Sequence, residues 1–199
     1  MRVVLLRHGQ TDLNRKHLIQ GSSVDHSLTT AGRDFAIRSA ANFDIADFDL
    51  VYCSPLKRAK ETADIFVKNK KKLIFDDRIK ERDFGEWDAE NYFELKKKHP
   101  DAFDQGGHIG PGYLKYAPHG ESIKQLSARV SSFLNELYSK AADKKVLIVC
   151  HGTLARMITA HYLTHGDMSQ FDSLKNCALV AFNVDEHGAR LSYYNRLIV

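Results

Sequence analysis

Short runs of apolar, mostly branched residues alternate along the chain with patterns of helical period, and this alternation restricts the fold more than any other feature. Continuous apolar runs occupy residues 3–6, 50–53, 73–75 and 146–150. Uninterrupted runs of this kind are typical of strands buried on both faces, as in a parallel sheet. Two later runs, at 179–184 and 191–197, predict further strands at the edge of the sheet.

Helical patterns fill the intervals between these runs. One pattern covers residues 35–43, and a second follows Ser54, expected as the helix cap, and Pro55, expected in its first turn. A third begins with a capping box over Ser122–Gln125, and a fourth begins near Thr153. Strands that alternate with helices in this way predict an α/β sandwich with a mostly parallel sheet.

The length of the chain, 199 residues with 43% hydrophobic content, suits one substantial core. Residues 1–199 are therefore predicted to form a single domain. From about residue 85 to 120 the alternation breaks down, because this stretch holds one short helical pattern (92–95) and the glycine-rich segment 105–112. Long irregular insertions in compact domains usually act as lids or binding loops, so residues 85–120 are predicted to be a cap over the site.

Charge and cysteine content exclude several classes of protein. The net charge of +4 suits an anionic substrate without identifying one. Cys53, Cys150 and Cys177 are widely spaced and form no Cys-x-x-Cys motif, so neither disulfides nor a structural zinc is expected. The basic run at 68–72 has no aromatic residues arranged for stacking on bases. With no export signal and no run long enough to span a bilayer, we expect a cytoplasmic protein without nucleic-acid or membrane partners.

Residues that can bind or transfer a phosphoryl group follow four of the predicted strands. Arg7 and His8 follow the first strand, Arg58 follows the second and Glu81 follows the third. His151 follows the apolar run at 146–150. Ligands of open α/β sheets bind beyond the carboxyl ends of the strands. These five side chains are therefore expected to converge on one edge of the sheet.

The chemistry of this set is coherent for phosphoryl transfer. Arg7 and Arg58 can bind phosphate oxygens through planar, bidentate guanidinium groups. Neutral His8 is a candidate nucleophile that would split hydrolysis into formation and breakdown of a phosphohistidine. Glu81 is a candidate proton donor to the leaving oxygen and then acceptor from water. His151, as a cation, would stabilise charge on the transferring group, so that no metal or other cofactor is required.

Five blocks of sequence follow one another along nearly the whole chain. The first is Arg7-His8-Gly9-x-Thr11-x-x-Asn14, continued by Gln20-Gly21, Leu28-Thr29 and Gly32. The second is Ser54-Pro55-Leu56-x-Arg58-Ala59-x-x-Thr62-Ala63, and the third is Glu81-x-Asp83-Phe84-Gly85-x-Trp87. The last two are Pro118-x-Gly120-Glu121-Ser122 and His151-Gly152. In this order and at these positions, the blocks resemble those of the histidine phosphatase superfamily, also called the phosphoglycerate mutase-like family.

The resemblance implies both a fold and a set of roles. The fold of the family is a three-layer α/β/α sandwich with a mostly parallel sheet. By similarity, His8 would be the phosphorylated residue and Glu81 the acid and base. The residues that would hold the phosphate are Arg7, Asn14, Arg58 and His151, with Gln20, Gly21 and Gly152 nearby.

Two other functions stay open beside a phosphomonoester hydrolase. Cofactor-dependent phosphoglycerate mutases of the family typically carry Glu-Arg-His-Tyr-Gly where this chain has Glu81-Arg82-Asp83-Phe84-Gly85. They also have a larger insertion and a tail beyond the last strand, so both departures favour the hydrolase. A non-catalytic protein that binds a phosphorylated ligand is the second alternative, although no catalytic residue is missing.

The sequence does not identify the substrate or the oligomeric state. Asp83 has an alternative assignment as the structural partner of an arginine. The cap contains Lys115 and two histidines, His108 and His119, that can bind a second acidic group. Its aromatic residues favour a small phosphorylated metabolite with an apolar part; they are Trp87, Tyr92, Phe93, Tyr113 and Tyr116.

Overall fold

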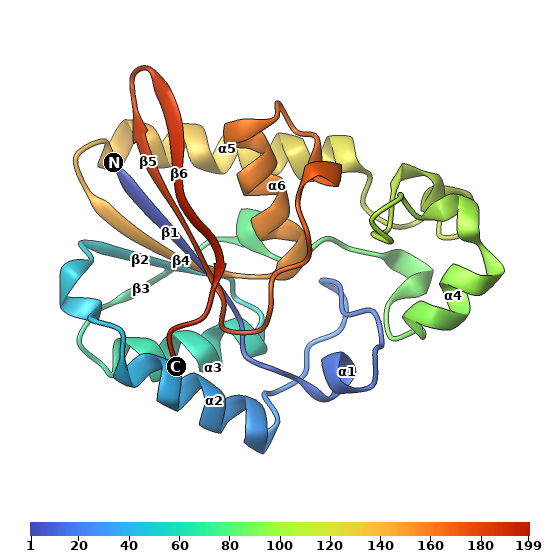
Figure 1. Ribbon diagram of the computed structural model, residues 1–199, viewed down its shortest axis with the longest axis horizontal. Coiled ribbons are helices and arrows are strands. Elements are labelled where there is room, and N and C mark those ends of the chain that lie inside the picture. Colours follow the sequence, from blue (N-terminus) through green and yellow to red (C-terminus); the bar gives the residue numbers. More distant parts are fainter.

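Six strands form one mixed sheet in the order β3-β2-β4-β1-β5-β6, in a computed structural model that describes residues 1–199 (Figure 1). The strands are β1 (Arg2–Arg7), β2 (Leu50–Cys53), β3 (Leu73–Phe75), β4 (Lys145–Cys150), β5 (Leu179–Asp185) and β6 (Gly188–Arg196). Neighbouring strands among β1 to β4 are parallel, whereas β5 is antiparallel to both β1 and β6. The prediction of a mostly parallel sheet is confirmed.

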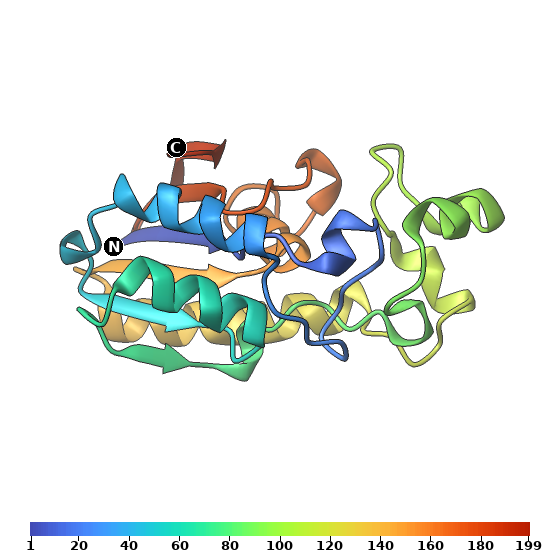
Figure 2. The same ribbon diagram turned by 90° about the horizontal axis from the view of Figure 1, so that it is seen from below.

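Helices cover both faces of this sheet (Figures 1 and 2). The α-helices of the chain are α1 (Asp12–Arg15), α2 (Thr30–Ala41), α3 (Lys57–Val67), α4 (Tyr92–Lys98), α5 (Ile123–Ala141) and α6 (Gly152–Leu163), of which α1 and α4 lie beyond the ends of the strands. Side chains of α2 and α3 pack on one face, and those of α5 and α6 pack on the other, which gives the three-layer sandwich that the resemblance implies. None of these helices combines the length and the apolar character needed to cross a bilayer.

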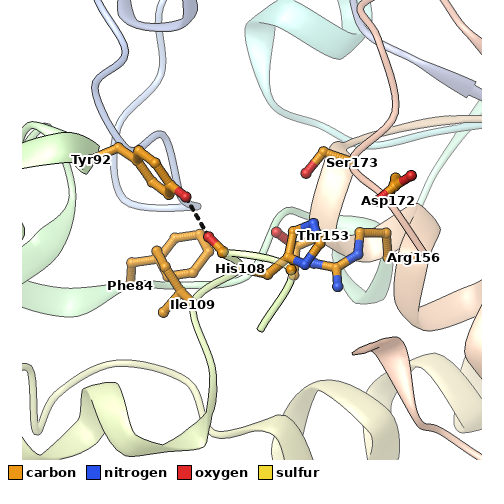
Figure 3. A pocket seen from close by; sticks show the side chains of 10 residues that line it. Phe84, Tyr92, His108, Ile109, Thr153, Arg156, Asp172 and Ser173 are labelled. Atoms are coloured by element: carbon orange, nitrogen blue, oxygen red, sulfur yellow. Dashed lines mark hydrogen bonds between the residues drawn. The ribbon is translucent and has the colours of Figure 1, made fainter. Parts of the chain in front are cut away.

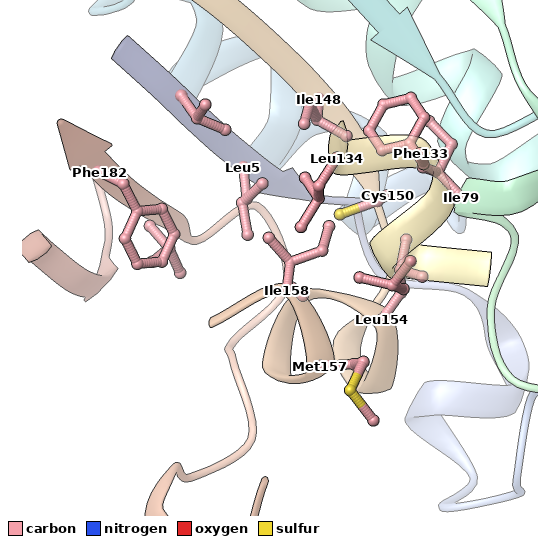
Figure 4. Close-up of a cluster of buried hydrophobic side chains, with 14 of the residues drawn as sticks. Leu5, Ile79, Phe133, Leu134, Ile148, Cys150, Leu154, Met157, Ile158 and Phe182 are labelled. Carbon is pink, nitrogen blue, oxygen red and sulfur yellow. The ribbon is translucent and has the colours of Figure 1, made fainter. Parts of the chain in front are cut away.

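Alternate residues of the central strands enter two separate hydrophobic clusters. Val3 and Leu5 of β1 belong to the cluster with α5 and α6, whereas Val4 and Leu6 belong to the cluster with α2 and α3. Figure 4 shows the first cluster, where Leu5 lies among side chains of both helices. Because both faces are covered, β1 and β4 are apolar along almost their whole length, which explains the uninterrupted runs in the sequence.

Two predictions about individual strands are wrong. The sequence places the run 179–184 at an edge of the sheet, but β5 lies inside the sheet and pairs with both β1 and β6. The run 73–75 is predicted to be buried on both faces, but β3 is an edge strand and Phe75 is 47% exposed. Both errors concern the neighbours of a strand, which its own residues do not specify.

Two helices also differ from their sequence patterns. α3 begins at Lys57 rather than after a cap at Ser54, and the N–H of Lys57 donates to the Asp25 carboxylate at 2.8 Å. In α2 the pattern includes Ile37 in the apolar face, but this side chain is 52% exposed. The other two starts are confirmed, because the capping box over Ser122–Gln125 begins α5 and α6 begins one residue before Thr153.

Residues 85–120, called the cap below, form a layer of short elements beyond the carboxyl ends of β1 to β4 (Figure 2). The cap contains α4 and three short 3₁₀ helices. Ile19, from before the cap in sequence, donates its N–H to the Glu90 carbonyl at 2.9 Å and accepts from the Ala89 N–H at 2.8 Å. A small cluster of buried side chains joins the two segments: Ile19, Phe84, Trp87, Ala102, Tyr113 and Ala117.

Candidate active site

The five side chains predicted to converge on one edge of the sheet do lie together. The rings of His8 and His151 have their centroids 5.2 Å apart, and Arg58 Nε lies 3.2 Å from His151 Nδ1. Glu81 accepts hydrogen bonds at the N-terminus of α6, which begins directly after His151. Arg7 lies in the same place, because a Cβ atom added at Gly152 would be 3.4 Å from its guanidinium carbon.

His8 is buried, 3% exposed, and its ring has a defined tautomer. Its Nδ1 lies 2.7 Å from the carbonyl oxygen of Gly9. A carbonyl oxygen can only accept, so Nδ1 carries the proton and Nε2 keeps a free lone pair. Burial, together with the positive charges of Arg58 and Arg7, lowers the pKa of His8 well below its ordinary value. The ring is therefore neutral at physiological pH, as a nucleophile must be.

His151 is fully buried, and its hydrogen bonds contradict the prediction of a cation. The Arg58 Nε–H donates to His151 Nδ1, so Nδ1 has no proton, and Nε2 donates to the Ser54 hydroxyl at 2.7 Å. Burial, Arg58 and His8 all lower the pKa of His151 well below its ordinary value. His151 is a neutral hydrogen-bond donor here because a second positive charge beside Arg58, away from water, is unfavourable.

Arg58 is fully buried and connects α3 to the loop before α2. Besides its bond to His151, Nη1 donates to the Val24 carbonyl at 2.9 Å and Nη2 to the Gly21 carbonyl at 3.0 Å. Burial lowers the pKa of Arg58 to about 10, which still leaves it charged at neutral pH. A guanidinium has five N–H groups, so two remain for a phosphate.

Two buried nitrogen donors in the site have no hydrogen-bond partner. They are Nε of Arg7 and Nε2 of Gln20. Arg7 is held in place by a bond from Nη1 to the Leu174 carbonyl, and Gln20 by a 2.7 Å bond from the Thr11 hydroxyl to its Oε1. Buried N–H groups without partners are uncommon and costly. Arg7 directly precedes His8 in the chain, so its unpartnered N–H is one that an anion at this site could use.

Asn14 is fixed by a residue that the sequence interpretation misses. Its Oδ1 accepts from the Thr11 N–H within the capping box of α1, at 3.2 Å, and from Asn176 Nδ2, also at 3.2 Å. Asn176 Nδ2 also donates to the His8 carbonyl at 3.0 Å. Asn176 belongs to no motif and lies between α6 and β5, so only the folded structure brings it to the site.

A second missed contact positions the backbone after His8. The Gly9 N–H donates to the Thr62 hydroxyl at 2.9 Å, and that hydroxyl donates in turn to the Arg58 carbonyl at 2.7 Å. Thr62 belongs to the second sequence block, so its presence in the motif is a signal, although the motif alone does not indicate its contact. Through Thr62, α3 fixes the N–H of Gly9, the residue whose carbonyl orients the His8 ring.

Gly21 has space only for a hydrogen at its Cα position. A Cβ atom there would lie 2.3 Å from Oδ1 of Asp88 and 2.6 Å from the Arg82 carbonyl. The close approach lets the Gly21 N–H donate to Asp88 Oδ1 at 2.7 Å, while the Gly21 carbonyl accepts from Arg58. Asp88 is another residue without a signal in the sequence, and burial raises its pKa.

Glu81 is 6% exposed and binds the first turn of α6. Its Oε2 accepts from the Thr153 N–H and its Oε1 from the Leu154 N–H, both at 3.0 Å. Both bonds use N–H groups that a helix leaves unpaired in its first turn, so the carboxyl group of Glu81 is held in a fixed orientation. Two other acids close to Glu81 in sequence make different contacts: Asp83 accepts from the Gly85 N–H at 2.8 Å, and exposed Glu86 pairs with His119. The alternative assignment of Asp83 as partner of an arginine is wrong.

Arg129 of α5 supports the backbone around Glu81. It forms two hydrogen bonds to the carboxylate of Glu121, at 2.6 and 2.8 Å. It also donates to the carbonyls of Lys80 at 2.9 Å and Glu81 at 3.1 Å. Charge-assisted, bidentate contacts are the strong and directional ones, so Glu81 is fixed from both its backbone and its carboxylate.

A cavity of ≈390 Å³ lies between the cap and α6 (Figure 3). Tyr92 is the only one of the five predicted cap aromatics on its wall, because Trp87 and Tyr113 are buried in the cap itself. Lys115 is exposed and pairs with Asp101 at 3.7 Å, so it is not part of the wall. The residues that line the cavity are Phe84, Tyr92, Gly106, Gly107, His108, Ile109, Thr153, Arg156, Asp172 and Ser173.

The whole chain matches a known family. Residues 3–197 match the histidine phosphatase superfamily (branch 1), and the chain belongs to this superfamily. Its relatives include the uncharacterized phosphatase PhoE of Bacillus subtilis, 30% identical over 195 residues that cover 97% of this chain and 93% of PhoE. The glucosyl-3-phosphoglycerate phosphatase of Mycolicibacterium vanbaalenii is 30% identical over 172 residues, which cover 81% of this chain and 74% of that one.

A solved structure gives the same result for the fold. A histidine-to-alanine variant of phosphoserine phosphatase from Entamoeba histolytica, in complex with phosphoserine, superposes with a TM-score of 0.80 and 26% identity. The match covers 98% of this chain and 96% of that chain. The resemblance seen in the sequence is confirmed, and the protein is a phosphatase of the histidine phosphatase superfamily.

Proposed function

We propose that this phosphatase hydrolyses the phosphomonoester of a small organic molecule through a phosphohistidine on His8, with Glu81 as proton donor and acceptor. One observation carries the proposal: the Nδ1–H of His8 is bound to the Gly9 carbonyl, which leaves Nε2 free beside the unpartnered N–H of Arg7. A neutral ring with one lone pair, next to donors for phosphate oxygens, has the properties of a nucleophile toward phosphorus.

In the first step, Nε2 of His8 attacks the phosphorus. The N–P bond forms as the P–O bond to the alcohol breaks, and the leaving oxygen takes a proton from the protonated carboxyl of Glu81. The ring becomes positively charged, and this charge is stabilised by the Nδ1–H bond to the Gly9 carbonyl. Arg7, Arg58 and Gln20 supply N–H donors to the phosphoryl oxygens.

In the second step, water attacks the phosphorus from the side that the alcohol has left. The new O–P bond forms, the N–P bond breaks, and its electron pair returns to Nε2. The carboxylate of Glu81 takes the proton from the water, which restores its starting state. Inorganic phosphate then leaves. Because the charge is handled by arginines and N–H donors, the proposal requires no metal ion.

The test uses p-nitrophenyl phosphate and purified protein in the presence of EDTA. We expect the wild type to release phosphate. A His8→Ala variant should lose this activity while keeping the far-UV circular dichroism spectrum of the wild type. His187→Ala, a change at an exposed histidine in the β5–β6 hairpin, is the matched control and should keep full activity. Incubation with a labelled substrate and rapid quenching should give acid-labile label in the wild type and none in His8→Ala.

Other outcomes separate the alternatives. Interconversion of the two monophosphoglycerates without net phosphate release would favour the mutase. Tight binding of a phosphorylated ligand with no label on His8 would favour a binding protein. If His8→Ala retains the wild-type rate, the assignment of His8 as nucleophile is wrong.

A further inference from the structure

The segment between α6 and β5 is bonded to the end of β1, where His8 lies. The carbonyl of Leu174 accepts a hydrogen bond from Nη1 of Arg7. The N–H of Cys177 donates to the carbonyls of Arg7 and His8, at 3.1 and 3.3 Å. Asn176 contacts the same place with its side chain, because its Nδ2 donates to the His8 carbonyl at 3.0 Å. The backbone of the proposed nucleophile is therefore held by this segment.

The segment is itself held in a fixed shape. Oδ1 of Asn195, on β6, accepts from the Lys175 N–H at 2.8 Å. Cys177 and Asn195 have φ values of +58° and +57°, in the left-handed region that residues other than glycine occupy only where the surrounding structure requires it. The residues on both sides of Asn176 are thus fixed, and they determine where its side chain lies.

The hydrogen bonds of Asn176 determine which way the side-chain amide of Asn14 faces. One N–H of the Asn176 amide binds the His8 carbonyl, which can only accept, so the nitrogen lies on this side. The same nitrogen donates to Oδ1 of Asn14 at 3.2 Å, and the Thr11 N–H, which can only donate, binds that oxygen at 3.2 Å. Two donors therefore hold the oxygen of Asn14, and its NH₂ group faces away from both.

Gln20 shows the same arrangement as Asn14. Its Oε1 accepts from the Thr11 hydroxyl at 2.7 Å, while its Nε2 is buried without a partner. The NH₂ group of Asn14 also makes no hydrogen bond within the protein, since all of its side-chain bonds are made by Oδ1. Thr11 thus binds the oxygen atoms of two amides and leaves both NH₂ groups unpaired. Such N–H groups attract the oxygen atoms of an anion, whereas amide oxygens repel them.

α1 is too short to hold Asn14 in place by itself. It is one turn of four residues, and an isolated helix of this length is not stable in water. The other hydrogen bonds of Asp12–Arg15 stay within residues 11–18. The bond from Asn176 is therefore the one that joins this turn to a distant part of the chain.

We propose that Asn176 is a positioning residue for phosphate binding, which holds Asn14 with its NH₂ group toward the phosphoryl group at His8; this rests on the proposed function. The NH₂ group of Asn14 then adds an N–H donor to those of Arg7 and Gln20. Without Asn176, the oxygen of Asn14 keeps one donor, the Thr11 N–H. A rotation of the amide by 180° would then turn an attraction for phosphate into a repulsion.

The test measures the dissociation constant of inorganic phosphate by titration calorimetry in a double-mutant cycle. Asn176→Ala should weaken binding about threefold to tenfold, the value of roughly one hydrogen bond, and Asn14→Ala should weaken it about tenfold. In the double variant the loss should stay within about twofold of that in Asn14→Ala alone, because Asn176 acts through Asn14. Partial unfolding reduces the amount of protein that binds, not the dissociation constant, so a merely structural role cannot imitate this result.

Two further variants keep the test specific. Asn176→Asp has almost the same shape, but an ionised carboxylate cannot donate and would face two acceptors, the His8 carbonyl and Oδ1 of Asn14. It should bind phosphate more weakly than Asn176→Ala does. Asn183→Ala is the matched control, because Asn183 on β5 pairs with Arg2 at the opposite end of β1, and its dissociation constant should equal that of the wild type.

The outcomes distinguish this inference from the proposed function. The role of Asn176 is wrong if Asn176→Ala binds phosphate as the wild type does, or if its effect is the same with and without Asn14. A dissociation constant for Asn176→Asp no higher than for Asn176→Ala would contradict the donor role, and a wild type that binds no phosphate would leave no site for Asn176 to serve. The mechanism on His8 is tested separately, because calorimetry reports binding without turnover, and it fails if His8→Ala retains turnover.

Discussion

At the scale of single residues, the site depends on one hydrogen bond that chooses the tautomer of His8. The bond from Nδ1 to the Gly9 carbonyl, at 2.7 Å, points Nε2 away from its own backbone. Burial, together with the positive charges of Arg58 and Arg7, lowers the pKa of the same ring and keeps it neutral. The orientation and the charge state of this proposed nucleophile thus have separate structural causes, and each can be tested alone.

The stability of the protein should depend on pH through His8. Its pKa is lowered in the folded state and close to 6.5 in the unfolded state, so below pH 6.5 the unfolded chain binds a proton that the folded one does not. The contribution of neutral His8 to the free energy of unfolding is therefore complete above pH 6.5 and is lost as the pH falls below that value. Urea unfolding between pH 8 and pH 5 should show a shallower decline in His8→Gln, by up to about 1.4 kcal/mol per pH unit. His187→Gln should keep the wild-type slope, and an equal slope in His8→Gln would contradict a neutral buried His8.

Glu81→Gln should slow turnover by about 10² to 10⁴ in kcat, because the amide neither gives nor takes the proton. With p-nitrophenyl phosphate the leaving phenolate needs little protonation, so His8 should still be phosphorylated. Stopped-flow measurement should then show a burst of nitrophenolate before slow steady turnover. Glu86→Gln, at an exposed acid that pairs with His119, is the control without effect. If Glu81→Gln loses both the nitrophenolate burst and the steady-state turnover, the assignment of Glu81 to proton transfer is contradicted.

Much of the candidate site is predictable from the residues that follow the strands in sequence. The parts that are not predictable all depend on contacts between residues distant in sequence. Arg7, His8, Glu81 and His151 follow from the rule that ligands bind beyond the carboxyl ends of the strands. The charge of His151 does not, because it depends on burial and on the position of Arg58. Asn176 and Asp88 bind the site across 162 and 67 residues of sequence, and no local pattern indicates such contacts.

At the scale of elements, α6 serves three parts of the site at once. Its first N–H groups bind Glu81, its preceding residue is His151, and its second turn carries Arg156. The strands were the most predictable elements because their apolar runs reflect burial on both faces. The position of β5 and the capping of α3 by Asp25 were not predictable, since each is decided by a partner distant in sequence.

The loop that contains Gly21 should tolerate no side chain. In Gly21→Ala the Cβ would lie 2.3 Å from Asp88, so the loop must move away from Arg58. We expect a loss of about 1–3 kcal/mol in the free energy of unfolding and weaker inhibition by inorganic phosphate. Gly110→Ala, where a Cβ meets nothing closer than 3.5 Å, is the matched control. Unchanged phosphate inhibition in Gly21→Ala would show that this loop does not shape the anion site.

At the scale of the whole molecule, the prediction of one domain with a cap insertion has a direct test. Trp87 is 3% exposed in the small cluster of the cap, separate from the two clusters of the sheet. Trp87→Ala should destabilise the cap by about 3–5 kcal/mol and open it locally. Limited proteolysis should cut within residues 85–120 while the sheet resists, and Phe93→Ala, at a side chain 57% exposed, should remain protected. Cutting throughout the chain would mean that cap and sheet unfold together.

The pairing of Ile19 with Ala89 and Glu90 limits how this protein can be re-engineered. In the sequence, the cap is one continuous insertion. It could therefore be expected to be exchangeable between relatives as a unit, which would change the alcohols that the enzyme accepts. Its cluster, however, includes Ile19, and Ile19 leads directly into Gln20 and Gly21 of the proposed anion site. If residues 85–120 alone are transplanted, their contacts with Ile19 no longer match, next to the proposed phosphate site. The exchangeable module is therefore discontinuous, and a working chimera must carry the segment 17–21 together with the cap.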